Sequence, residues 1–283
     1  MNHINKRSPK GAFQFILLTI SIAMKPVALA ILFLTTLLAT SKSSNSGLPL
    51  PIYPLQPLTG SGHEHHLHGI SCQSWRLGVE TNNIQGWKTV PLSCEAYVGH
   101  YMLGHLYRQD SKVVTNEAAL YAEGLNLTKD GKDVWVFDID ETTLSNLPYY
   151  AEHGFGAEPY NSTLFDAWVD TGKAPALPES LKLYKKLLSL GFKIVFLTGR
   201  LEKRREITVT NLKSVGYHTW EKLILKSSND SGTALAIKSS KRKELEAQGY
   251  KILGNMGDQW SDILGNNAGQ RTFKLPDPMY YIS

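Results

Sequence analysis

The sequence VWVFDIDETT, residues 134–143, decides the fold of this chain. Residues 134–139 (VWVFDI) form a short, almost uninterrupted apolar run, which predicts a buried β-strand. Acidic and hydroxyl residues, DIDET (138–142), stand where this strand ends. A strand that is apolar along its length is typical of a parallel sheet with both faces covered. The stretch therefore indicates a strand of an α/β domain with a polar site at its end.

The residues that follow alternate between strand and helix patterns. Apolar runs predict further strands at 193–198 (KIVFLT), 222–226 (KLILK) and 251–255 (KILGN). Helical patterns predict helices at 181–190, 202–215 and 237–248, and residues 74–125 are mainly helical in pattern. This order predicts an α/β fold with a three-layer parallel sheet. In such sheets the ligand site lies at the carboxyl ends of the strands.

Polar residues follow two more of the predicted strands. The second strand ends in Thr198-Gly199-Arg200, and the last one runs into GDQWSD (257–262). Two lysines, Lys238 and Lys241, stand at the start of the third predicted helix. Because the carboxyl ends of parallel strands share one edge of the sheet, we expect these side chains in one site.

These residue types suit phosphoryl transfer. A carboxylate can attack phosphorus and form an aspartyl-phosphate, and Asp138 is the predicted nucleophile. Asp140 would protonate the leaving alcohol and then accept a proton from the attacking water. Thr198 and Lys238 would stabilise the negative charge on the transferred group, with Lys241 as the alternative lysine.

The same site offers oxygen ligands for a magnesium ion. Mg²⁺ prefers oxygen ligands and is held by few protein carboxylates. The predicted ligands are Asp138, the backbone carbonyl of Asp140, and Asp258, with Asp262 nearby or reaching the ion through water. Simpler interpretations exist: the first two aspartates can cap a turn, Thr198 can be a strand-end residue, and Asp262 can cap the helix after Trp260.

Four motifs in this order resemble those of the haloacid dehalogenase-like hydrolases: DIDET, FLTGR, Lys238 in KSSKR, and GDQWSD. Together with CQSWRLGVETNNIQGWKTVPLSCEAYVGHYM (72–102), they are similar to the plant acid phosphatases and vegetative storage proteins of the class B acid phosphatase group. The resemblance covers roughly residues 65–283.

The resemblance implies a Rossmann-like, haloacid dehalogenase-type sheet with an N-terminal helical extension and a small cap insertion at about 143–178. It also implies a small phosphomonoester substrate and an acidic optimum, since an aspartate acting as an acid works best when partly protonated. A storage glycoprotein without catalysis is the alternative, and it predicts loss of the nucleophile or metal ligands. The motifs are kept, so storage as the sole role is disfavoured, whereas a double role stays open.

The basic residues gather at the start of the chain. Five cations account for the whole net charge of +5: Lys6, Arg7, Lys10, Lys25 and Lys42. Residues 43–283 are therefore formally neutral (+5 minus 5), which argues against nucleic acid or anionic lipid as a partner.

The first 70 residues are predicted to lie outside the enzyme domain. From Met24, a short basic region, an apolar stretch and small residues predict a cleavable signal peptide, with an uncleaved anchor as the alternative. Met1 and Met24 are both candidate start sites. We divide the chain into a leader (1–42), a Ser/Gly/Pro/His-rich linker (43–70) and a phosphatase domain (71–283). After cleavage we expect no stable membrane insertion.

Two further features agree with a secretory route to the apoplast or vacuole. Cys72 and Cys94 are the two cysteines, and they are expected to form a disulfide, with two buried thiols as the alternative. Asn126, Asn161 and Asn229 begin glycosylation sequons. A homodimer is left open beside a monomer.

Overall fold

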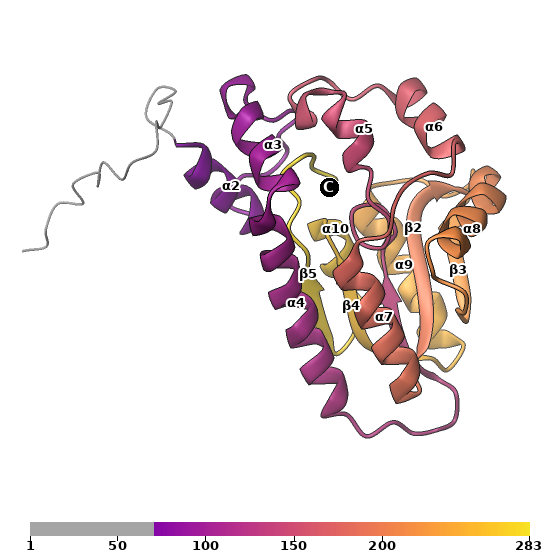
Figure 1. The fold of residues 1–283 in the computed structure, drawn as a ribbon. Coiled ribbons are helices and arrows are strands. Elements are labelled where there is room, and N and C mark those ends of the chain that lie inside the picture. The colour runs from indigo at the N-terminus through magenta and orange to yellow at the C-terminus, as the bar shows by residue number, and fades with distance from the viewer. Residues whose placement is uncertain (1–70) are drawn as a thin grey trace, which may run out of the picture. The chain divides into compact units, whose positions relative to one another are not determined.

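The computed structural model describes residues 71–283, so the predicted leader and linker lie outside the described residues. Five parallel strands form one sheet in the order β3-β2-β1-β4-β5 (Figure 1). Their bounds are β1 Asp133–Phe137, β2 Lys193–Leu201, β3 Lys222–Lys226, β4 Lys251–Gly257 and β5 Arg271–Lys274. The predicted α/β fold with a parallel sheet is confirmed, and β5 is an additional edge strand.

Helices connect these strands and flank the sheet. Their bounds are α2 Cys72–Glu80, α3 Glu95–Leu103, α4 His105–Glu123, α5 Leu147–Ala151, α6 Ser162–Asp170, α7 Pro178–Leu190, α8 Arg205–Ser214, α9 Ala234–Ala247 and α10 Trp260–Ile263. Three short 3₁₀ turns are η1 Leu92–Cys94, η2 Gly154–Gly156 and η3 Glu202–Arg204. Among residues 71–283, none of the helices has both the length and the apolar character needed to cross a membrane.

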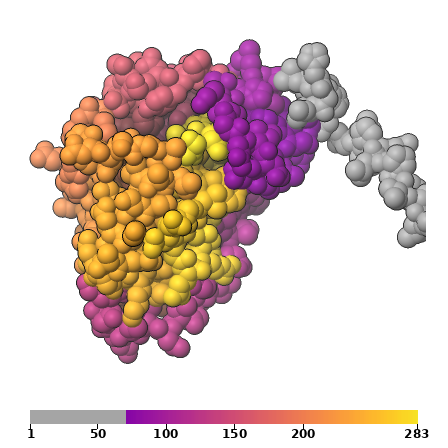
Figure 2. All heavy atoms as spheres, turned by 180° about the vertical axis from the view of Figure 1, so that it is seen from behind, coloured from indigo at the N-terminus to yellow at the C-terminus, as the bar shows by residue number. Residues whose placement is uncertain are grey.

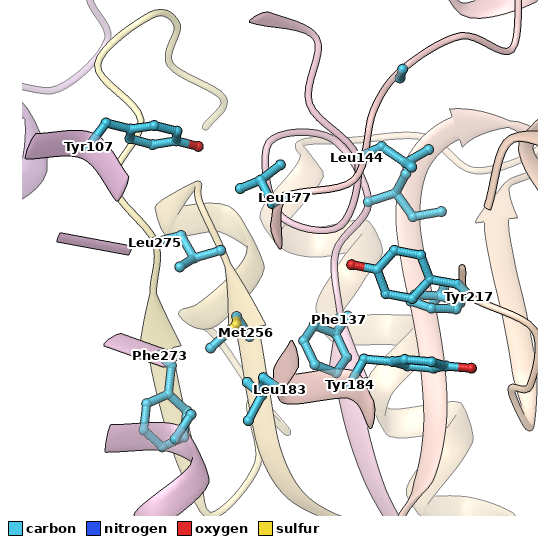
Figure 3. Close-up of a cluster of buried hydrophobic side chains, with 14 of the residues drawn as sticks. Tyr107, Phe137, Leu144, Leu177, Leu183, Tyr184, Tyr217, Met256, Phe273 and Leu275 are labelled. Atoms are coloured by element: carbon cyan, nitrogen blue, oxygen red, sulfur yellow. The ribbon is translucent and has the colours of Figure 1, made fainter. Parts of the chain in front are cut away.

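Strand β1 divides its side chains between two cores because neighbouring residues of a strand point to opposite faces. Trp135 and Phe137 belong to the large core, which also holds Leu183 and Leu187 of α7. Figure 3 shows Phe137 and Leu183 in this core. On the other face, Val134 and Val136 pack in a smaller core that includes Leu245 of α9. Its remaining buried members are Val195, Leu197, Tyr250 and Ile252. The sheet is therefore the middle of three layers, as predicted.

One glycine of β4 permits the large core to close over β1. A Cβ atom on Gly254 would lie 2.4 Å from ring atoms of Trp135, far inside an ordinary contact distance. The indole of Trp135 stacks in turn on Phe273 of β5, with ring centroids 5.4 Å apart. Gly254 is required here for close packing between neighbouring strands.

The N-terminal extension (residues 71–104) is fastened outside the sheet. A disulfide joins Cys72 to Cys94, as expected. Glu80 of α2 forms an ion pair with Lys274 of β5 at 2.6 Å. Figure 2 shows this extension against the yellow residues at the end of the described chain. Residues 81–91 run without helix, although a mainly helical pattern was expected there.

An insertion lies between β1 and α7, where the cap was expected. It contains α5, η2 and α6. Its η2 turn touches the extension, since the Val90 N–H donates to the Gly156 carbonyl at 2.9 Å. A Cβ on Gly156 would lie 1.9 Å from the carbonyl oxygen of Met279, so the insertion also contacts the last described residues through backbone.

Candidate active site

The chain turns sharply after β1, and this turn presents two aspartates to one site. The Asp138 N–H continues the strand pairing by donating to Met256 of β4 at 2.9 Å. Beyond it, the Thr143 and Leu144 N–H groups both donate to the Ile139 carbonyl at 2.8 Å. Asp138 and Asp140 therefore flank a turn rather than lie on one extended strand.

Lys238 lies against the predicted nucleophile. Its Nζ donates to Asp138 Oδ1 at 2.5 Å and also to Asp262 Oδ1. All three side chains are buried. Burial alone would lower the pKa of Lys238, but the adjacent carboxylates outweigh it and raise that pKa, so the lysine stays charged. Lys241, one turn further along α9, instead pairs with Asp230 at 3.3 Å, away from this cluster.

Three buried carboxylates meet beside Lys238. Asp138, Asp258 and Asp262 each offer an oxygen, and these oxygens lie within 4.8 Å of one another. Burial raises the pKa of Asp138 well above its usual range, and the charges of Asp262 and Asp258 add to the rise against the opposing effect of Lys238. Burial and the charge of Asp262 likewise raise the pKa of Asp258 to about 7.

This donor set fits a divalent metal ion. Three carboxylates and one ammonium group would leave a buried excess of negative charge, which is costly in a low-dielectric site. Oxygen donors of this kind are the ligands of hard cations such as Mg²⁺. A cation between the three carboxylates would offset both their mutual repulsion and their burial. Asp262 also accepts the Gln259 N–H at 2.9 Å, so it caps α10 as well as joining the cluster.

The Asp140 side chain is held by Arg200 rather than by Lys238. The guanidinium donates through Nη2 at 2.7 Å and through Nε at 3.1 Å, and Asn146 Nδ2 adds a bond of 2.8 Å. Burial alone would raise the pKa of Asp140, but the charge and hydrogen bonds of Arg200, with those of Asn146, hold that pKa below its ordinary range. Asp140 thus carries its own counter-charge, separate from Lys238.

Thr198 lies in β2, at the point where the pairing of β2 with β3 shifts register. Its side chain is 3% exposed, and its Oγ1 accepts the Arg200 N–H at 3.1 Å. The hydroxyl hydrogen can still donate to a ligand. The structure therefore brings Asp138, Asp140, Thr198 and Lys238 to one edge of the sheet, as the sequence predicted.

Several polar residues at this edge were not assigned roles from the sequence. Arg200 had a visible signal, because it directly follows the polar residues that end a buried strand. Asn146 had none: its amide oxygen accepts Trp168 Nε1 at 2.9 Å, which ties the Asp140 contact to helix α6 of the insertion. Glu141 is fully buried with a positive φ of 53°, a conformation that non-glycine residues seldom adopt.

Paired aspartates follow the first strand of this parallel sheet, a threonine lies in the second, and a lysine and two aspartates complete the same site. This combination defines a haloacid dehalogenase-like hydrolase. The chain belongs to the acid phosphatases of that superfamily, subfamily IIIB, whose pattern matches residues 58–283. Members of this group hydrolyse phosphate monoesters, and a divalent metal is general among the superfamily's phosphatases.

Similar plant proteins include both enzymes and storage proteins. Acid phosphatase 1 of Solanum lycopersicum is 46% identical over 256 residues, which cover 89% of this chain and 97% of that protein. The Stem 28 kDa glycoprotein of Glycine max is 52% identical, and the match covers 82% of this chain and 91% of the glycoprotein. Vegetative storage protein 1 of Arabidopsis thaliana is 42% identical, and the match covers 92% of this chain and 99% of the storage protein.

Among solved structures, a class C acid phosphatase from Bacillus anthracis is similar, with a TM-score of 0.55 and 25% identity. The match covers 67% of this chain and 86% of the bacterial one. A second structure of that class C enzyme, with tungstate bound, gives a TM-score of 0.51 and 26% identity.

Proposed function

We propose that the chain hydrolyses phosphomonoesters through an aspartyl-phosphate formed on Asp138. One observation carries this proposal: Asp138 and Asp140, which stand on either side of Ile139 in the chain, have different counter-charges, Lys238 and Arg200. Lys238 holds an Asp138 oxygen beside a fixed positive charge. Arg200 and Asn146 orient Asp140 and favour its ionised form, which suits accepting a proton from the attacking water. Two carboxylates in different surroundings are what a nucleophile and a proton carrier require.

The roles follow from this arrangement. An Asp138 oxygen attacks phosphorus and the ester bond to the alcohol oxygen breaks. The acid role requires Asp140 to carry a proton when substrate is bound, and that proton goes to the departing alcohol oxygen. Water then attacks the aspartyl-phosphate, Asp140 takes a proton from that water, and phosphate leaves. Thr198 and Lys238 stabilise the negative charge on the non-bridging oxygens in both steps.

We propose Mg²⁺ as the metal ion. Asp138, Asp258 and the Asp140 backbone carbonyl would hold it, with Asp262 close by or contacting it through water. When bound, the ion would neutralise charge on the transferred group and on the ligating carboxylates. The oxygen-only donor set and the excess of buried carboxylates support this choice.

The relatives support a secretory location, because two of them are named as a glycoprotein and a storage protein. We propose residues 1–42 as the leader and 43–70 as the linker, with release to the apoplast or vacuole. The three sequon asparagines support this proposal because each is exposed: Asn126, Asn161 and Asn229. The homodimer stays a prediction.

A storage role remains the second candidate, favoured by the similarity to Vegetative storage protein 1. Storage requires no ordered catalytic carboxylates, whereas this site keeps the nucleophile, the proton carrier and the acidic cluster in contact with their counter-charges. The two roles are compatible, and storage as the only role is disfavoured.

The test is a phosphatase assay on purified residues 71–283, or on the secreted protein, with and without Mg²⁺. Asp138→Asn should reduce turnover to background while melting remains cooperative, because it removes the attacking carboxylate. Asp130→Asn, a surface substitution in the loop before β1, is the matched control. Tungstate should inhibit the wild type, as its presence in the class C structure suggests. Full activity in Asp138→Asn would refute the covalent mechanism.

A further inference from the structure

Gln259 lies between two carboxylates of the acidic cluster and contacts both. Its backbone N–H donates to Asp262 Oδ2 at 2.9 Å, and its side-chain Nε2 donates to Asp258 Oδ2 at 2.8 Å. The residue is 7% exposed, so water does not replace these donors easily. One residue therefore orients two of the three clustered carboxylates.

The Gln259 amide is itself fixed on its remaining sides. The second Nε2 hydrogen goes to Asp277 Oδ2 at 2.9 Å, and Oε1 accepts the Ile282 N–H at 3.0 Å. Asp277 is held in turn, because its Oδ1 accepts the Met279 N–H at 2.9 Å. Both amide hydrogens and the amide oxygen thus have partners, which leaves the side chain one orientation.

These supports come from one stretch of chain, residues 275–283, here named the closing segment. It begins where the Leu275 N–H donates to the Gly257 carbonyl at 2.9 Å. Tyr280 from this segment reaches Glu141 Oε2 at 2.9 Å and Asp258 Oδ2 at 3.2 Å. The Ser283 carbonyl accepts the Ala234 N–H at the start of α9, the helix that carries Lys238. In Figure 1 the segment runs from β5 toward the insertion.

The chemistry of these contacts differs from that of the charged pairs at the same site. Lys238 and Arg200 neutralise the carboxylates that they touch, which weakens the attraction of those groups for a metal ion. Gln259 and Tyr280 are neutral donors, so they fix the direction of the Asp258 carboxylate without cancelling its charge. Thr142 Oγ1, also neutral, holds the other oxygen at 2.8 Å.

We infer that Gln259 is a positioning residue of the metal site and that the closing segment, through Asp277 and Ile282, holds it in place. This inference rests on the metal site proposed above. Groups that orient metal ligands typically contribute about ten- to hundredfold to metal affinity.

The test is calorimetric titration of metal-free protein with Mg²⁺ at one fixed pH. Gln259→Leu keeps the bulk of the side chain but loses its amide contacts, and we expect Kd to rise about ten- to hundredfold. Turnover should recover substantially when Mg²⁺ is raised in proportion. Ile282→Ala is the control, because it removes an exposed side chain and keeps the N–H that Gln259 uses, so its Kd should equal that of the wild type.

Melting curves of the metal-free proteins distinguish a loss of orientation at the metal site from a loss of folding. Weaker Mg²⁺ binding with cooperative metal-free melting supports the inference. An unchanged Kd, whether or not the melting temperature falls, overturns it. If Gln259→Leu does not fold, Asp277→Asn serves instead: an amide supplies one oxygen where the carboxylate supplied two, so one of its contacts is lost and Kd should still rise. A wild type that binds no Mg²⁺ would refute the proposed metal site rather than the role of Gln259.

Discussion

Gly257 is the residue whose substitution by alanine should disturb the site most directly. It ends β4, and a Cβ built there would lie 2.2 Å from the Cβ of Asp262 and 2.4 Å from its Oδ2. Ordinary carbon contacts are about 3.5–4.0 Å. Relief of this overlap therefore requires Asp262 to move by more than about 1 Å. A Cβ is anchored to the backbone, so a simple rotamer change of Asp262 is not enough.

The displacement has two consequences for the Gly257→Ala variant. Overpacking of this kind lowers the free energy of unfolding by about 1–3 kcal/mol. Movement of Asp262 also separates its carboxylate from Lys238 and from the Gln259 N–H. A misplacement of about 1 Å at a catalytic site reduces the rate about 100-fold, or about 2.7 kcal/mol of transition-state stabilisation. We therefore expect kcat/KM to fall about 100-fold, with weaker Mg²⁺ binding.

Steady-state kinetics with an aryl phosphate and urea unfolding measure both effects. Gly124→Ala is the matched control: a Cβ there would lie 3.5 Å from its nearest neighbour, an ordinary contact, at the end of α4 and remote from the site. Its kinetics should be unchanged, and its stability equal or slightly raised because alanine restricts the unfolded chain. Wild-type kinetics and stability in Gly257→Ala would show that the overlap with Asp262 is not a constraint.

Three further predictions concern separate parts of the molecule. Asp140→Asn should slow substrates with poor leaving groups most, and an aryl phosphate should give a product burst followed by slow turnover; equal loss for all leaving groups would contradict its role as proton carrier. Reduction of Cys72–Cys94 should lower the unfolding free energy by about 3 kcal/mol and the melting temperature by roughly 6–12 °C, and an unchanged melting curve would count against this. Burial alone would raise the pKa of Glu179, but the hydrogen bonds and charge of Arg108 hold that pKa below its usual value. The stability this adds is present above the unfolded pKa, about 4.3, and is lost as the pH falls through the folded pKa. Glu179→Gln should thus unfold about 1 kcal/mol more easily in urea at pH 6, and the difference should shrink as the pH falls below the unfolded pKa; a difference independent of pH would exclude this ion pair as its source.

The elements that the sequence predicted well are those whose signal is local. Residues 134–139 and 193–198 are apolar along their length because both faces of the strand are covered, and the structure has β1 and β2 there. The four motifs stand at strand ends or at a helix start, and parallel topology alone brings such positions to one edge. Fold and acidic site therefore follow from local patterns and one topological rule.

The elements that were missed depend on partners remote in sequence. Strand β5 (RTFK) is four residues long at the sheet edge, and its polar residues show no strand pattern. Residues 81–91 contain Gly86 and Asn82 at positive φ and end in Pro91, which explains the missing helix. The choice between Lys238 and Lys241 depended on which face of α9 meets β1, and that is set by tertiary packing.

The contacts of Gln259 and Asn146 were not predictable for a related reason. Gln259 meets residues 277 and 282, which follow it by 18 and 23 positions. Asn146 joins the nearby Asp140 to Trp168 of α6, 22 positions further along the chain. An amide carries no periodicity and no charge, so a single sequence gives no indication of its partner.

The closing segment has a consequence for the order in which the protein is made. Strand β1 obtains its second neighbour only when β4 has been synthesised, and Gln259 obtains its supports only from residues 277–282. Domains generally fold as units once their residues are present. A growing chain that stops before residue 277 would therefore contain Asp138 and Asp140 but lack the supports of Gln259. The orientation of Gln259 is therefore completed only after residues 277–282 have been added to the chain.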